Sequence, residues 1–255
     1  MILLDELMAF LNTYMGDAQA AARIDLHMAN GLQVRGREQV RTIVTGVSAS
    51  LRFFQEAIAQ GSDALIVHHS LNMPAGILFD RIFMQRLRYL WEHDLSLIGY
   101  HYLLDSHPEI GNNAQIIKTL GGHLLESYPA EGWGWVGSID GGADRDELLS
   151  RCTQLFSQQG VQYPFGPQRV QTMIAISGAG APRPGEMEWL MQRGVDLLIT
   201  GEAREWNREL FREAGISFVA AGHYHTERIG IQALSDVLRD RLGVEVKFVD
   251  LPNPV

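Results

Sequence analysis

Three short apolar runs in this chain each stop at histidine, and no other feature constrains the fold as much. Short apolar runs separated by helical patterns are typical of strands in a parallel α/β sheet. In open α/β sheets, ligands bind beyond the carboxyl ends of the strands. The pattern therefore predicts a polar site at strand ends. The runs and the histidines after them are 64–67 with His68 and His69, 96–100 with His101, and 216–221 with Gly222 and His223.

Strand-like and helix-like patterns alternate over most of the chain, which predicts an α/β fold of two linked lobes, mainly with parallel sheets and helices on both faces. The rhythm breaks at roughly 126–168 and resumes at 169. We therefore expect one lobe of residues 1–125 plus 200–255, which carries the site, and a second, inserted lobe of residues 126–199. Expected strands are 42–47, 65–67, 96–100, 169–176, 195–199, 216–221 and 244–249, and expected helices are 3–14, 51–60, 80–93, 113–120, 144–158, 185–193, 203–213 and 226–241.

Composition narrows the class of protein. Of 255 residues, 46% are hydrophobic and 20% charged, as in ordinary globular proteins. A net charge of -9 argues against an extended nucleic-acid partner. The single cysteine, Cys152, cannot form an internal disulfide, and acidic Asp5 and Glu6 stand where a secretory signal would carry basic residues. Because no apolar run reaches the length of a membrane span, we expect a soluble, cytoplasmic protein.

The residues at the strand ends have the chemistry of metal ligands. Neutral imidazole suits zinc, iron, nickel and copper, and carboxylates can bridge two ions. A lone histidine pair is more often a core or capping feature, but here the pattern recurs and acidic residues follow two of the runs. His223 and Glu227 are four residues apart and would share a helix face. On pattern alone, His225 could replace His223. The candidates are His68, His69, His101, Asp105, His223 and Glu227.

Other polar residues have weaker signals. The stretch Gly178–Ala181 is interpreted as a strand-to-helix turn rather than a phosphate loop, because it lacks the lysine of a P-loop. Glu202 could support the site or open a helix, with equal weight. Asn112 and Asn113 are expected to cap a helix. The histidines without ligand-like spacing, expected to be structural or exposed, are His27, His93, His107 and His123.

Six segments together resemble the GTP cyclohydrolase 1 type 2 homologues, also called NGG-interacting-factor-like dinuclear metal proteins. They occur in the family's order and span nearly the whole chain. Any one of them alone would be a weak signal. The segments are 30–34 (Asn-Gly-Leu-Gln-Val), 66–69 (Ile-Val-His-His), 101–105 (His-Tyr-Leu-Leu-Asp), 111–113 (Gly-Asn-Asn), 199–202 (Ile-Thr-Gly-Glu) and 222–227 (Gly-His-Tyr-His-Thr-Glu).

This resemblance implies two linked α/β lobes and two divalent ions per chain, which could be zinc, iron, manganese or nickel. His223 is preferred to His225, because the family places its histidine directly after the glycine. Glu227 would bridge the ions, and His101 would lie beside them. Family members also form toroidal hexamers, so a homohexamer is expected. The implied ligands are His68, His69, Asp105, His223 and Glu227.

The favoured function is a dinuclear metal-dependent hydrolase acting on a small nucleotide-like substrate, as in a cyclohydrolase reaction or the hydrolysis of damaged nucleotides. His101 or Glu202 would move protons. Five ligands shared by two ions leave coordination positions open, which favours an enzyme. The alternatives are a non-catalytic metal-binding protein that assembles into a ring, and a two-metal peptidase or phosphatase.

Overall fold

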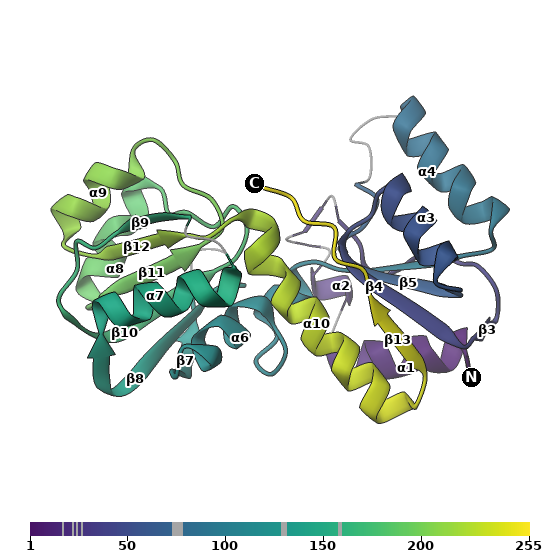
Figure 1. The fold of residues 1–255 in the computed structure, drawn as a ribbon, viewed down its shortest axis with the longest axis horizontal. Coiled ribbons are helices and arrows are strands. Elements are labelled where there is room, and N and C mark those ends of the chain that lie inside the picture. The colour runs from purple at the N-terminus through teal and green to yellow at the C-terminus, as the bar shows by residue number, and fades with distance from the viewer. Residues whose placement is uncertain are drawn as a thin grey trace. The chain divides into compact units, whose positions relative to one another are not determined.

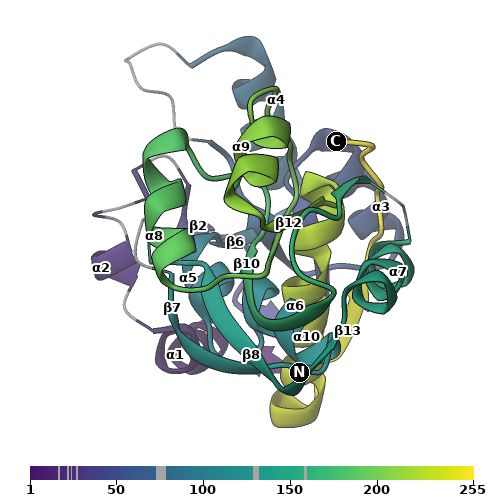
Figure 2. The same ribbon diagram turned by 90° about the vertical axis from the view of Figure 1, so that its left-hand side faces the viewer.

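The computed structural model describes residues 1–16, 18–21, 23, 25–26, 28–72, 79–128, 132–157 and 160–255 (Figures 1 and 2). Its chain divides into two compact units. Unit 1 comprises Met1–Leu104 and Ile231–Leu251, and unit 2 comprises Asp105–Gly230 and Pro252–Val255. These boundaries differ from the expected division at 125/126 and 199/200. The reason is strand pairing, which joins the strands that lie between His123 and Ala220 in one sheet.

Unit 1 is built on a five-stranded sheet in which β13, β4, β5 and β6 are parallel neighbours and β2 runs antiparallel along β6. Parallel strands end at the same edge, so residues that follow β4, β5 and β6 emerge together. Ser48 is paired with His69 in this register. The strands in sheet order are β13 (Glu245–Phe248), β4 (Thr42–Ser48), β5 (Ala64–His69), β6 (Ser96–Tyr100) and β2 (Asn30–Val34).

Both faces of this sheet are covered. Val44, Leu65 and Leu97 face a buried cluster that includes residues of α3 (Leu51–Ala59) and α4 (Arg81–Glu92). The side chains of Ser50 and Asp80 cap these two helices. On the opposite face, Thr45 Oγ1 lies 2.8 Å from Ser235 Oγ in α10 (His223–Leu242). The remaining elements of unit 1 are β1 (Ile2–Leu3), paired with β3 (Gln39–Val40), α1 (Leu4–Met15) and α2 (Ala18–Ala21).

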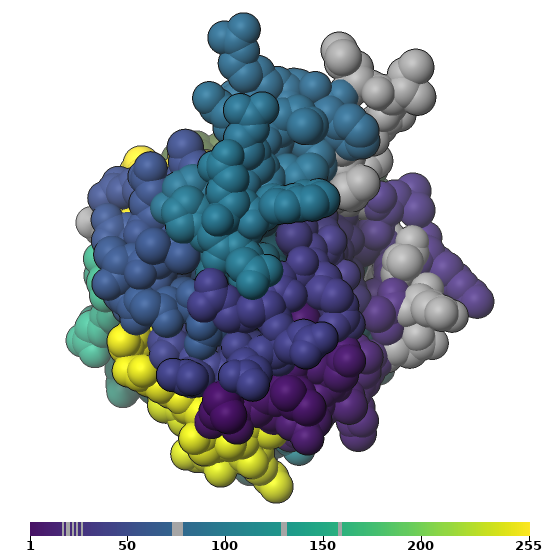
Figure 3. All heavy atoms as spheres, turned by 90° about the vertical axis from the view of Figure 1, so that its right-hand side faces the viewer, coloured from purple at the N-terminus to yellow at the C-terminus, as the bar shows by residue number. Residues whose placement is uncertain are grey.

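The outer surface of α4 is unusually apolar. Trp91 is 80% exposed and Ile82 61% exposed, and the helix forms a ridge on the surface of unit 1 (Figure 3). Only Leu90 of α4 is buried. The helix is thus held by one face, and its exposed apolar side chains, such as Ile82 and Trp91, lie outside the core.

Unit 2 contains a six-stranded sheet. Its three central strands, β10, β11 and β12, are parallel, and antiparallel strands flank them on both sides. The strands in sheet order are β7 (His123–Ser127), β8 (Trp135–Asp144), β10 (Arg169–Ile176), β11 (Leu197–Thr200), β12 (Ser217–Ala220) and β9 (Val161–Tyr163).

The central strands of unit 2 are buried on both faces, which explains their continuous apolar sequence. Ala175 and Ile199 pack with residues of α6 (Asn112–Thr119) and α7 (Arg145–Phe156). Alternate residues such as Ile174, Leu198 and Phe218 pack instead with α8 (Met187–Gln192) and α9 (Asn207–Ala214). Figure 1 shows the two helix layers on opposite sides of the sheet. The short elements are α5 (Tyr102–Ser106) and the 3-10 turn η1 (Pro184–Glu186).

The expected α/β class with two lobes is confirmed. Residues 30–34, absent from the expected strands, form the edge strand β2. Its polar sequence concealed the strand, since β2 pairs with β6 on one side only. Within the described residues, no helix combines the length and apolar character needed to cross a membrane.

Candidate metal centre

In unit 1, the side chains of His68, His69 and His101 form a cluster, called here the imidazole cluster. The first two end β5 and the third follows β6, its parallel neighbour. The ring centroids lie 4.6 to 5.4 Å apart. Each ring offers one nitrogen, and these three atoms lie within 4.8 Å of one another. The fold thus gathers three nitrogen donors at a spacing that suits a metal ion.

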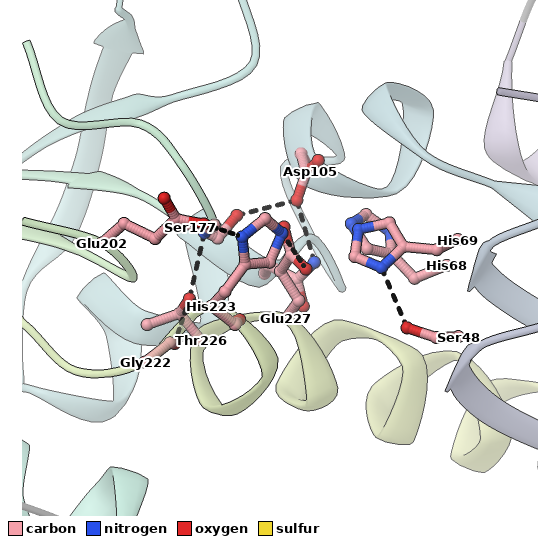
Figure 4. Close-up of polar contacts among 12 residues, drawn as sticks. Ser48, His68, His69, Asp105, Ser177, Glu202, Gly222, His223, Thr226 and Glu227 are labelled. Carbon is pink, nitrogen blue, oxygen red and sulfur yellow. Dashed lines mark hydrogen bonds and ion pairs between the residues drawn. The ribbon is translucent and has the colours of Figure 1, made fainter. Parts of the chain in front are cut away.

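Hydrogen bonds orient these rings. His68 Nδ1 donates to the carbonyl oxygen of Tyr100 at 2.9 Å, and His101 Nδ1 donates to Asp25 Oδ2 at 2.7 Å. Neither partner oxygen can donate, so the Nδ1 atoms carry the protons, and in the neutral rings the lone pair lies on Nε2. Metal-binding histidines are held in this way in known metal sites. His69 Nδ1 lies 3.1 Å from Ser48 Oγ (Figure 4).

Asp25 is a site residue that the sequence did not reveal. Asn30 Nδ2 also donates to Asp25, at 3.0 Å, while Asn30 Oδ1 accepts from the His101 backbone N–H. Burial alone would raise the pKa of Asp25, but the hydrogen bonds from His101 and Asn30 lower it below its usual value. A buried, ionised carboxylate therefore fixes the orientation of the His101 ring.

Unit 2 carries a second cluster, called here the carboxylate cluster, of Asp105, Glu202, His223 and Glu227. Asp105 lies in α5, and Glu227 lies one turn after His223 in α10. Asp105 is only 2% exposed, and Glu227 is only 3% exposed. His223 Nε2 lies 3.1 Å from Glu227 Oε2, and His223 Nδ1 lies 2.6 Å from Glu202 Oε1 (Figure 4). Asp105 and Glu227 each offer an oxygen within 4.8 Å of the other.

The two carboxylates around His223 change its protonation. Burial alone would lower the pKa of His223, but Glu227 and Glu202 raise it to about 9. Without a metal, the ring is therefore an imidazolium at neutral pH and supplies positive charge to the buried acids. A bound cation would supply that charge instead, and His223 would give up a proton to bind it. These residues therefore fit a divalent ion.

Buried amides and a hydroxyl hold Asp105. Its Oδ1 accepts from Asn112 Nδ2 at 2.9 Å and from Ser177 Oγ at 2.8 Å. Asn113 Nδ2 donates to the Asp105 carbonyl oxygen, and its Oδ1 accepts from the Ser177 backbone N–H. The expectation that the two asparagines cap α6 was wrong, because Gly111 is at the cap and both side chains are buried against Asp105.

Glycines at two strand ends make room for the carboxylate cluster. Gly178 follows β10 with a φ of +61°, and a Cβ atom there would lie 2.2 Å from Glu227 Oε1. At Gly201, after β11, a Cβ atom would lie 2.6 Å from the Gly178 carbonyl oxygen. Gly178 N–H donates to Thr226 Oγ1 at 3.0 Å. The turn expected at residues 178–181 thus has a specific role, because its first residue, Gly178, packs against the Glu227 carboxylate.

The structure places the sequence candidates as follows. His68, His69 and His101 meet within unit 1, and Asp105, Glu202, His223 and Glu227 meet within unit 2. Their nitrogen and oxygen donors suit zinc, iron, manganese or nickel. His27 lies outside the described residues. Three other histidines make local contacts instead, namely His93 with the Tyr89 carbonyl oxygen, His107 with the Glu109 and Ile110 backbone N–H groups, and His123 with Ser138 Oγ.

Comparisons with known proteins relate this chain to a family that has solved structures. A family model described as Duf34/NIF3 (NGG1p interacting factor 3) matches residues 2–254. A protein of Escherichia coli K12 named "GTP cyclohydrolase 1 type 2 homolog" is 38% identical over 237 residues, 92% of this chain and 94% of that protein. An Archaeoglobus fulgidus protein of the same name is 37% identical over 227 residues, 88% and 90% of the two chains. A solved structure described as "protein ybgI, unknown function" superposes with a TM-score of 0.87 at 35% identity and covers 100% of both chains.

Proposed function

Because the chain belongs to the Duf34/NIF3 (NGG1p interacting factor 3) family, we propose that it is a dinuclear metal-dependent hydrolase acting on a small nucleotide-like substrate. One observation carries the proposal. His68 is hydrogen-bonded through Nδ1, so that Nε2 holds the lone pair, and the His69 ring lies beside it. Rings oriented in this way are typical of metal ligands, and the buried acids of unit 2 add the oxygen donors that a hydrolytic metal pair uses.

The proposed ligands of the two ions are His68, His69, Asp105, His223 and Glu227, with Glu227 as the bridge. Chain connectivity supports a shared centre, since Asp105 follows His101 by only four positions in the sequence. The burial of Asp105 and Glu227 supports it further, because buried carboxylates are stable when they are paired with a cation. Zinc, iron, manganese and nickel all accept this mixture of nitrogen and oxygen ligands.

Bound divalent ions would lower the pKa of water and supply a nucleophile near neutral pH. Other side chains of the protein would then orient the metal-binding residues and transfer protons. We assign proton transfer to His101 Nε2, because Asp25 on Nδ1 stabilises the imidazolium that forms when the ring accepts a proton. We assign Glu202 to orient His223 through its Nδ1 proton. Asn112 and Ser177 keep the Asp105 carboxylate in one orientation.

A screen for hydrolysis tests this proposal. Protein loaded with zinc, manganese, iron or nickel is assayed on nucleotides, damaged nucleotides, phosphoesters and dipeptides, beside a Glu227→Ala variant. We expect turnover of a nucleotide-like compound that a chelator abolishes, that added metal restores and that Glu227→Ala lacks. Turnover of dipeptides or phosphoesters alone would assign the peptidase or phosphatase alternative. No turnover by metal-replete protein would favour the non-catalytic assembly protein.

The homohexamer that the family resemblance implies stays a prediction. Light scattering at low micromolar protein concentration measures the mass of the assembly directly. A monomer of 28.5 kDa would contradict the prediction.

A further inference from the structure

Unit 2 contains a cavity of about 80 Å³ beside the carboxylate cluster. Part of its wall is the loop after β10, which includes Ala179 and Gly180. The same loop begins with Ser177, which donates to Asp105, and Gly178, which packs against Glu227. The cavity and two proposed metal ligands are therefore joined through one short segment of backbone.

Aromatic side chains form another wall. Tyr128 is buried, and its ring packs edge to face on Trp189 at a centroid distance of 5.3 Å. Trp133 also lines the cavity, and its carbonyl oxygen accepts from Asn113 Nδ2 at 2.8 Å. Asn113 in turn donates to the Asp105 carbonyl oxygen. Aromatic walls held this firmly suit a flat ring, because stacking needs a fixed surface.

The polar groups among the residues that line the cavity include one carboxylate and several N–H donors. Glu186 Oε2 accepts from the Arg183 backbone N–H at 2.6 Å, while Glu186 Oε1 makes no hydrogen bond within the described residues. Among the residues that the structure describes, the backbone N–H groups of residues 179–181 have no hydrogen-bond acceptor, and the Arg183 guanidinium has no ion-pair partner. A matching ligand therefore carries N–H donors next to a carbonyl oxygen on a flat ring.

We propose that this cavity is a base-binding subsite that takes the amide edge of a guanine-type base. The adjacent N1–H and N2–H groups of guanine donate to Glu186, its O6 accepts from the loop N–H groups, and its ring lies against Trp133. Adenine offers only its N6 amino group as a donor at that edge. This cavity of about 80 Å³ is smaller than the cavity of about 150 Å³ that holds benzene, so only the amide edge of the base would enter it. The sugar and phosphate stay outside, near Arg183.

The inference rests on the proposed function for its premise of a nucleotide-like substrate, and its test is independent of turnover. Calorimetry on chelator-treated protein measures the binding of GMP, AMP and ribose 5-phosphate. We expect GMP to bind more tightly than AMP and ribose 5-phosphate not to compete. Hydrogen bonds to charged groups are strong, so Glu186→Gln should weaken GMP binding by about 10- to 100-fold.

The Glu186→Gln variant suits the test. The amide oxygen of glutamine can still accept from the Arg183 backbone N–H, whereas its NH2 group replaces the other carboxylate oxygen and can only donate. Glu188→Gln is the matched control, since Glu188 is exposed, hydrogen-bonds Gln192 and does not line the cavity. Trp133→Leu should also weaken GMP binding. Equal GMP affinity in the Glu186 and Glu188 variants, or AMP binding as tightly as GMP, would overturn the inference. If GMP binding does not depend on Glu186 but the protein still hydrolyses a nucleotide-like substrate, the base-binding inference fails and the proposed function is retained.

Discussion

The imidazole cluster of unit 1 and the carboxylate cluster of unit 2 both pair histidine with acids, but in opposite proportions. In unit 1, three rings lie near one buried acid, Asp25, which accepts hydrogen bonds from His101 and Asn30. In unit 2, His223 has a carboxylate at each ring nitrogen. Unit 1 thus presents nitrogen lone pairs that are ready for a metal. Unit 2 holds a proton on His223 that a metal must first displace.

The clusters also differ in how the backbone supports them. His68 and His69 end a strand, so the register of a parallel sheet fixes where they lie. Asp105 and Glu227 lie on helices, and buried polar side chains or a close-packed glycine set their orientation. The nitrogen donors should therefore be robust to substitution nearby, whereas the oxygen donors should be sensitive to it.

The largest effect is expected on removal of a ligand. The parent protein should bind two divalent ions per chain. Removal of a hydrogen-bond partner of a ligand typically lowers metal affinity by about 10- to 100-fold. Removal of a ligand itself, in His69→Ala or Glu227→Ala, should lower metal affinity by more than this factor. His93→Ala is the control, because His93 bonds the Tyr89 carbonyl oxygen in α4. Elemental analysis of protein purified without chelator measures the ions. Equal metal loss in the His69 and His93 variants would mean that the ligands are misplaced.

The protonation of His223 predicts how metal binding depends on pH. Because its folded pKa is about 9, the proton competes with the metal at neutral pH, and apparent metal affinity should rise about 50-fold between pH 7 and pH 9. In metal-free protein, the raised pKa stabilises the folded state below about pH 6.5, and this stabilisation is lost as pH rises through about 9. Metal titration against a chromogenic chelator gives the affinities. Glu202→Gln should flatten the rise, and an unchanged slope in that variant would contradict this assignment.

Replacement of the outer acid in unit 1 should have a smaller effect. Asp25→Asn removes the charge that stabilises the protonated His101 ring, so it should lower substrate turnover by about 10- to 100-fold. Asp80→Asn is the matched control, because Asp80 caps α4 and asparagine caps equally well. The hydrolysis assay compares the two variants with the parent. If both turn over the substrate as the parent does, proton transfer by His101 does not depend on the Asp25 carboxylate.

The smallest effect is expected for alanine substitution of a glycine beside the carboxylate cluster. Comparison with a second glycine distinguishes backbone strain from crowding of the Glu227 carboxylate. Gly178 and Gly194 both have positive φ, but only Gly178 has an acid where a Cβ atom would go. Alanine in this conformation costs about 1–2 kcal/mol at either position. Gly178→Ala should cost more than Gly194→Ala and should alone weaken metal binding, because it displaces the Glu227 carboxylate. Chemical unfolding measures the difference in stability between the two variants, and metal titration measures the difference in metal affinity. Equal results for the two variants would argue that Glu227 moves freely.

By itself, the sequence determined the α/β class and the residues at the strand ends. These follow from local patterns, since apolar periodicity predicts strands and helices, and parallel strands deliver the residues after them to one edge. His68, His69 and His101 could be grouped on that basis alone. Only the tertiary structure decided which side chains hold them. Asp25 is 76 residues from His101, and Ser177 is 72 residues from Asp105. Hydrogen bonds over such separations leave no periodic trace, because they depend on how the whole chain folds back on itself.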